Sequence, residues 1–78
     1  ESPLAPAILR GLGDRSYEKR KNAALEIEAL IKTLEDIHDH GRICSISSLL
    51  GQDFCASTNA NHRKGGLIGL AATAIGLM

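Results

Sequence analysis

Hydrophobic residues recur at three- and four-residue steps along most of the chain, which is the period of an amphipathic helix. The clearest stripe lies between Ser16, a residue type that caps helix starts, and the segment "DHG", which contains Gly41. Charged residues occupy the other faces of this stretch. The stripe comprises Ala24, Ile27, Leu30, Ile31, Leu34 and Ile37. The pattern predicts a long helix with Ser16 as its N-cap and Gly41 as its stop signal.

Three further helices are predicted on the same grounds. The first covers roughly residues 5–12, the next roughly residues 43–54, and the last begins near Asn61 and runs to the end of the chain. No stretch alternates hydrophobic and polar residues with the two-residue period of a strand for long enough to suggest a sheet. The predicted fold class is therefore all-α.

The second and fourth predicted helices can be superimposed at an offset of 43 residues, which places Arg20 on Arg63. The matched segments read "RKNAALEIEALIKTL" and "RKGGLIGLAATAIGL", and each follows a shorter helix and a polar turn. A two-helix unit that repeats about every 40 to 47 residues is typical of HEAT-type solenoids. Residues 1–78 are therefore predicted to be a fragment of a HEAT-type α-α superhelix. It would contain two antiparallel helix pairs, at about residues 4–38 and about residues 43–78.

The equivalent positions of Arg20 and Arg63 lead to a further structural prediction. In solenoids, arginines at equivalent repeat positions often bridge to an acidic residue of a neighbouring repeat. We therefore expect such a bridge from each of them.

The last segment begins with Arg63 and Lys64 and continues with fourteen uncharged residues, Gly65 to Met78. A Walker-type phosphate loop would place its glycines before the lysine, whereas here the lysine comes first. A membrane-spanning helix needs about 20 apolar residues, so it would require further residues after Met78. We favour a packed inner helix, because small residues allow another backbone to approach closely. The residues predicted to provide this close helix packing are Gly65, Gly66, Gly69, Ala72 and Gly76.

The charge balance narrows the classes of partner. Nine basic and nine acidic residues give a net charge of zero, whereas nucleic-acid-binding domains are normally strongly basic. One tyrosine and one phenylalanine are too few for a surface that stacks on bases, so no nucleic-acid partner is predicted. The basic residues cluster at the starts of the two long helices. They indicate either a partner-binding surface or an ordinary helix face exposed to solvent. The candidate partner-binding residues are Lys19, Arg20, Lys21, Arg63 and Lys64.

The remaining polar residues suggest no catalytic centre. None of the serines has a nearby His/Asp arrangement that periodicity can place, so nucleophilic catalysis has no support. Cys44 and Cys55 are predicted to be buried, reduced thiols of a cytosolic protein, with redox sensing as the alternative. The sequence therefore predicts no catalytic residue and no cofactor.

The segment "EDIHDH", Glu35 to His40, contains residue types that bind metals. However, His38 and His40 are two positions apart, so on a helix they point in different directions. They would converge only if the helix had already ended before them. We expect a solvated helix terminus here and no metal site.

The segments "YEKRKNAALEIEALI" and "HRKGGLIGLAATAI" together resemble the amino-terminal region of the Vac-fourteen family. That family provides the HEAT-repeat scaffold of the PIKfyve-type phosphatidylinositol 3-phosphate 5-kinase complex. The similarity extends over about residues 4–77, and "RKGGLIGLAA" is its specific part, because generic HEAT repeats share only the arginine and the small-residue spacing. The segment from Ile37 to Asn61 departs most from the family pattern.

The resemblance implies a non-enzymatic scaffold. Members of the family self-associate and hold the lipid kinase together with its opposing phosphoinositide phosphatase, and the complex controls phosphatidylinositol 3,5-bisphosphate. The implied location is cytoplasmic and peripheral on vacuolar or endolysosomal membranes. Self-assembly in the family is attributed to carboxy-terminal repeats, so this segment would lie outside that surface.

A second hypothesis is a small helical module that docks directly on acidic membrane through its basic cluster, Lys19 to Lys21, and its glycine-rich helix. The chain begins without methionine and ends inside an apolar segment, so we expect it to be a piece of a longer protein. Two repeats would expose an apolar end, and about three are usually needed for stability. The isolated chain is therefore expected to self-associate or to depend on neighbouring repeats.

Overall fold

The computed structural model describes residues 2–78 and is built from helices. In chain order the elements are α1 (Pro6–Leu12), α2 (Tyr17–Asp36), α3 (His40–Leu49), the π-helical turn η1 (Leu50–Phe54) and α4 (Ala60–Gly76). No strand occurs among the residues described, so the predicted all-α class is confirmed. Residue 1, which the predicted fragment includes, lies outside the described residues.

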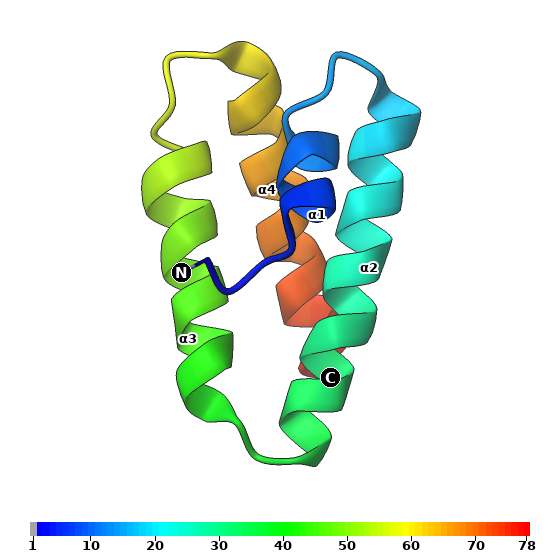
Figure 1. The fold of residues 1–78 in the computed structure, drawn as a ribbon, viewed down its shortest axis with the longest axis vertical. Helices are drawn as coiled ribbons and strands as arrows, with labels where there is room; N and C mark the ends of the chain where they lie inside the picture. The colour runs from blue at the N-terminus through cyan, green and yellow to red at the C-terminus, as the bar shows by residue number, and fades with distance from the viewer. Residues whose placement is uncertain (1) are drawn as a thin grey trace.

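The helices form two antiparallel pairs that lie side by side (Figure 1). α1 runs against α2, and α3 runs against α4. α2 and α4 point in the same direction and make the most extensive contact between any two helices. This arrangement agrees with the predicted HEAT-like segment, in which the longer helix of each pair packs on the longer helix of the next.

The long helix α2 starts as predicted. The hydroxyl oxygen of Ser16 accepts a hydrogen bond from the backbone N–H of Lys19 at 3.4 Å. Glu18 lies in the first turn, where the positive end of the helix dipole favours a negative charge. Ser16 is thus confirmed as the N-cap, because it satisfies one of the backbone donors that a helix start leaves unpaired.

The predicted stop at Gly41 is wrong, because α2 ends earlier and Gly41 lies inside α3. His38 takes the left-handed conformation, with φ of 58°, that glycine usually occupies after a helix. The Asp39 N–H donates to the carbonyl oxygen of Leu34 at 2.8 Å, and the His38 N–H donates to that of Glu35 at 3.1 Å. These two bonds form a Schellman motif, which satisfies carbonyl groups at the end of α2.

The third helix also begins earlier than the predicted residue 43. It starts at His40, and the Asp39 carboxylate accepts the backbone N–H of Arg42 at 3.2 Å. Its last part is the π-helical turn η1, where the Cys55 N–H donates to the carbonyl oxygen of Leu50 at 2.9 Å. Leu50 and Phe54 both remain buried, so the wider turn keeps this face against the core.

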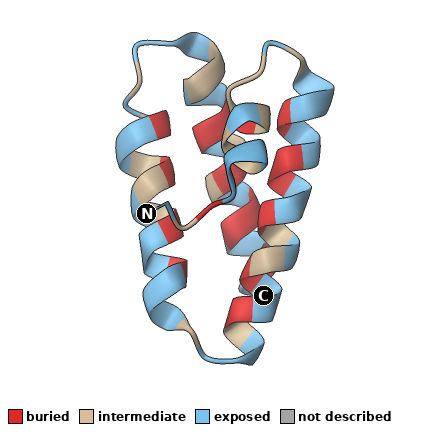
Figure 2. Ribbon diagram, in the orientation of Figure 1, coloured by how far each residue is buried: buried red, intermediate tan, exposed pale blue. Residues whose placement is uncertain are grey.

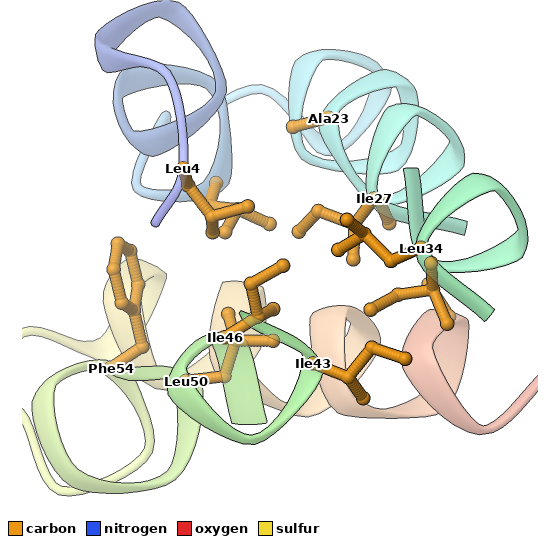
Figure 3. Close-up of a cluster of buried hydrophobic side chains, with 12 residues drawn as sticks. Leu4, Ala23, Ile27, Leu34, Ile43, Ile46, Leu50 and Phe54 are labelled. Atoms are coloured by element: carbon orange, nitrogen blue, oxygen red, sulfur yellow. The ribbon is translucent and has the colours of Figure 1, made fainter. Parts of the chain in front are cut away.

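The hydrophobic core fills the space where the inward faces of all the helices meet (Figures 2 and 3). α2 supplies most of its predicted stripe, but Ile37 is 64% exposed because it follows the end of the helix. The side chains on α3 and η1 reach toward this stripe from the opposite side (Figure 3). The buried cluster comprises Leu4, Leu12, Ala23, Ala24, Ile27, Ile31, Leu34, Ile43, Ile46, Leu50, Phe54 and Ala72.

Candidate functional site

The starts of α2 and α4 are built by the same local hydrogen bonds. Asn59 caps α4 as Ser16 caps α2, with its side-chain oxygen accepting backbone N–H groups of the first turn. The Ser16 N–H donates to the Asp14 carboxylate at 2.8 Å, and the Asn59 N–H donates to the Ser57 hydroxyl at 3.0 Å. The two capping residues, Ser16 and Asn59, are 43 positions apart, and so are the two acceptors, Asp14 and Ser57. This is the offset at which the two sequence segments match. The offset is therefore a repeat of backbone geometry and not only of residue types.

Arg20 and Arg63 extend the same equivalence. The Arg20 guanidinium donates to the carbonyl oxygens of Asp14 at 2.8 Å and Arg15 at 3.0 Å. The Arg63 guanidinium donates to the carbonyl oxygen of Ser57 at 2.9 Å. Each arginine thus fastens the loop before its helix to the first turns of that helix. The expected bridge to an acidic residue of a neighbouring repeat is absent from residues 2–78, since both arginines bind main-chain oxygens of their own loop.

The five candidate partner-binding residues do not form one surface. Arg20 is only 7% exposed, and its guanidinium lies 5.9 Å from the centre of the Tyr17 ring. Lys64 lines the same small hollow as Tyr17, and Lys21 lines the adjoining groove between α2 and α4. Lys19 instead lies beside the Asp14 carboxylate at 3.8 Å. The structure therefore brings Lys21 and Lys64 together around Tyr17 and places Lys19 on another side.

The small residues of α4 lie where other segments approach its backbone most closely. A Cβ atom on Gly65 would collide with the carbonyl oxygen of Leu12, at the end of α1. A Cβ on Gly66 would lie 2.8 Å from both the backbone nitrogen and the sulfur of Cys55. These two positions therefore have no room for a side chain.

The same face continues along the rest of α4. A Cβ on Gly69 would lie 2.9 Å from the Leu50 side chain, and a Cβ on Gly76 would lie 2.8 Å from the Cβ of Ile31. Ala72, between them, is 5% exposed and belongs to the core cluster. Small residues at these positions permit the close approach of η1 and α2 to α4.

The chain resembles curated proteins over most of its own length. It is 51% identical over 76 residues to "Protein VAC14 homolog" of Arabidopsis thaliana, which covers 97% of the chain and 10% of that protein. It is 47% identical over 75 residues to "Vacuole morphology and inheritance protein 14" of Saccharomyces cerevisiae. The match covers 95% of the chain and 8% of that protein. It is 40% identical over 72 residues to "Protein VAC14 homolog" of Schizosaccharomyces pombe. The match covers 90% of the chain and 9% of that protein.

The resemblance to the Vac-fourteen family is confirmed. The chain spans about a tenth of the length of these relatives, so it corresponds to one short segment of a Vac-fourteen protein. No family model matches the chain, and no solved structure matches it.

The last helix of this Vac-fourteen segment leaves an apolar stripe exposed. Leu67 is 64% exposed and Leu77 is 44% exposed, although the residues 43 positions earlier, Ala24 and Leu34, are buried. In α2 these positions face the core, whereas in α4 the glycine face is buried instead. Among residues 2–78, no helix has both the length and the apolar content that crossing a membrane requires.

Next to this stripe, the Vac-fourteen segment has an apolar groove between α2 and α4, with a volume of about 150 Å³. Its walls are formed by Leu25 on α2, which is half exposed, and by Ile68 and Ile75 on α4. Lys21 and Tyr17 lie at the same face. The exposed surface of the central helix pair is therefore apolar with a basic edge.

Two expectations about reactive side chains need correction. Cys44 is exposed on α3 and Cys55 is only partly buried, because the inward face of α3 is taken by Ile43 and Ile46. The two histidines of "EDIHDH" do converge, since the helix ends before them. Ligand atoms of Glu35, His38 and His40 all lie within 4.8 Å of one another. The signal that sequence analysis missed was the left-handed turn at His38.

Proposed function

We propose that this chain is a structural segment of a non-enzymatic, vacuole-related scaffold. The names of the relatives, one of which refers to vacuole morphology and inheritance, support the cellular role. The 43-residue repetition of caps, arginines and helices supports the scaffold role, because such repetition builds an extended surface rather than a closed catalytic pocket. We regard that repetition as the decisive observation.

The two helix pairs, at about residues 4–38 and about residues 43–78, would be consecutive repeats of the solenoid. Each pair consists of a shorter helix, a polar loop and a longer helix that carries the arginine. The arginine fixes the loop to the longer helix, so the angle within each pair is set locally. Stacking of the pairs then depends on the contact between α2 and α4.

A further helix pair of the same scaffold would cover the exposed stripe of α4. The stripe residues stand 43 positions after residues of α2 that pack against α4, α1 and α3. Since the relatives are about ten times as long as this chain, such a neighbouring pair is available in a protein of this family. The covered residues would be Leu67, Leu70, Ala74 and Leu77.

The full scaffold would hold a phosphatidylinositol 3-phosphate 5-kinase together with its opposing phosphatase, and so control phosphatidylinositol 3,5-bisphosphate. It would self-associate, and it would be cytoplasmic and peripheral on vacuolar or endolysosomal membranes. The basic edge formed by Lys21 and Lys64 is the part of this segment best suited to an acidic protein partner, because these two side chains are exposed around Tyr17.

The role of the segment can be tested by deleting it from the full-length protein. Affinity purification from cell extract would compare the complete protein with a version that lacks residues 1–78. Loss of the kinase or the phosphatase with self-association retained would identify the segment as a docking surface. If both partners stay bound and only solubility falls, the segment serves the stability of the solenoid. Loss of neither partner and unchanged solubility would contradict both roles.

The basic edge can be tested separately by charge reversal in the full-length protein. Changing Lys21 and Lys64 to glutamate should reduce recovery of the partner that docks here, while self-association remains. Arg42→Glu is the matched control, because Arg42 is exposed at the start of α3, away from this edge. Equal recovery of both partners from all variants would exclude the basic edge as a binding surface.

Direct docking on an acidic membrane is the alternative function. The observation that favours it is the exposed apolar pair Tyr17 and Leu67 beside Lys21 and Lys64. Binding of the purified chain to vesicles with and without phosphatidylserine would decide between the two. Binding that requires the acidic lipid and weakens with salt would support the alternative, because screening suppresses attraction to acidic lipids. The scaffold hypothesis expects no vesicle binding without protein partners.

A further inference from the structure

The junction between the two helix pairs brings three metal-binding side chains together. Glu35 lies in the last turn of α2, His38 in the turn after it, and His40 at the first position of α3. Their ligand atoms all lie within 4.8 Å of one another. Glu35 is half-buried, and the two histidines are exposed, so an ion from solution can reach all three.

The backbone that presents these side chains is held by hydrogen bonds on both sides. The Schellman bonds from His38 and Asp39 fix the end of α2, and the Asp39 carboxylate caps α3. His38 adopts φ of 58°, a conformation that is costly for residues other than glycine. Residues kept in such a conformation cluster at functional sites, so the outlier itself points to a role for the His38 side chain.

The distances within the cluster are close to those of a metal site. A zinc ion at about 2.0 to 2.2 Å from each ligand places neighbouring tetrahedral ligand atoms about 3.3 Å apart. The His40 Nε2 and Glu35 Oε1 atoms are already 3.1 Å apart. The rings of His38 and His40 stand edge to face with their centres 6.0 Å apart. The ligand atoms of all three residues lie within 4.8 Å of one another, so His38 would have to move closer by a side-chain rotation to complete the set.

We propose that Glu35, His38 and His40 form a binding site for Zn²⁺ or a similar divalent transition metal. Two imidazoles and one carboxylate are a ligand set that zinc accepts, with water in the fourth position. Asp36 and Asp39 flank the site in the chain and add negative charge, which favours a cation. Such an ion would tie the end of α2 to the start of α3 and so fix the junction between the two helix pairs.

The experiment is a Zn²⁺ titration of the 78-residue chain in competition with a chromophoric chelator, repeated with Co²⁺ to record the visible absorption of the bound metal. We expect one ion per chain. His38→Gly and Glu35→Gln should each weaken Zn²⁺ binding by about tenfold or more, because losing even an outer-shell partner costs about 10- to 100-fold. His62→Gln is the matched control, since His62 packs against Phe54 outside the cluster and should bind as the unaltered chain does.

The His38→Gly variant separates loss of a ligand from loss of the fold. Glycine is favoured at φ of 58°, so this variant should keep its helical content by circular dichroism while losing the metal. Nuclear magnetic resonance should show Zn²⁺ shifting the imidazole signals of His38 and His40 but not those of His62. Equal Zn²⁺ affinity in the unaltered chain and His38→Gly would overturn the proposal. The absence of saturable binding at one equivalent would overturn it as well.

Discussion

Arg20 and Arg63 stand at equivalent positions but differ in environment. Arg20 is almost fully buried and donates two hydrogen bonds to carbonyl oxygens, whereas Arg63 is exposed and donates one. Both bonds of Arg20 join the loop after α1 to the start of α2. A buried guanidinium that serves main-chain oxygens stabilises the fold, so Arg20 is better suited to that role than to contact with a partner.

Arg20→Ala should therefore cost more stability than Arg63→Ala. We expect a loss of about 3 kcal/mol in the free energy of unfolding for Arg20→Ala, because a buried, charged donor is removed from two part-buried carbonyl groups. Arg63→Ala should cost about 1 kcal/mol or less, since water can replace the lost bond. Urea denaturation followed by circular dichroism would measure both values. Equal losses would show that the two arginines are not distinguished by burial.

The glycines of α4 and η1 offer a second comparison at the residue scale. Gly65→Ala should lower the free energy of unfolding by about 3 kcal/mol or more, because its Cβ would overlap the Leu12 carbonyl oxygen and force α1 away. At Gly51 a Cβ would meet no atom within 4 Å beyond its chain neighbours and the backbone of its own helical turn. Gly51→Ala should therefore raise stability by about 0.5 to 1 kcal/mol, since alanine loses less backbone entropy. Thermal unfolding of both variants would test this contrast.

At the scale of the elements, the junction between α2 and α3 is the least ordinary feature. α2 ends in a Schellman motif whose left-handed residue is His38 in place of glycine. α3 then begins within two residues, at His40. The short junction returns the chain along α2, so that Ile43 and Ile46 reach the core.

Without metal, His38→Gly should raise the free energy of unfolding by about 1 kcal/mol, because it removes the cost of a left-handed residue with a side chain. The measurement is urea denaturation in the presence of a chelator. Gly41→Ala provides the comparison, since Gly41 lies within α3 and a Cβ at this position would have the Asp39 carboxylate as its nearest neighbour, at 3.9 Å. A loss of stability in His38→Gly would mean that the imidazole makes a stabilising contact of its own.

At the scale of the whole molecule, the two helix pairs are joined through α2 and α4 and leave one apolar flank open. Tyr17 and Leu25 on α2 and Leu67 and Ile75 on α4 are all about half exposed or more. Exposed apolar surface of this kind marks a contact with another segment or another protein. In the proposed scaffold, a neighbouring helix pair covers the α4 part of it.

The isolated chain should therefore self-associate through the stripe of α4. Replacing Leu67 and Leu77 with lysine should shift the chain toward monomer in analytical ultracentrifugation. It should change the free energy of unfolding of the monomer by only about 0.5 kcal/mol, because neither side chain belongs to the buried core. In the full-length protein the same pair should be destabilising if a neighbouring helix pair covers it. Unchanged association of the isolated chain would exclude this stripe as the contact.

The sequence by itself determined the start of α2, the all-α class and the 43-residue repeat. The cap Ser16 acts within three residues of its own position, so the local residue types are sufficient to place it. The hydrophobic stripe of α2 could likewise be predicted from the sequence, because polar residues occupy the other faces of this helix.

Only the tertiary structure decided which face of α4 is buried and where α2 ends. α4 is apolar on every side after Lys64, so its pattern does not distinguish the glycine face from the leucine stripe. The approach of Leu12 and Ile31 to Gly65 and Gly76 makes that choice, because only small residues leave room for a second backbone. The end of α2 likewise depended on the return of α3 to the core, and that return is what places His38 and His40 beside Glu35.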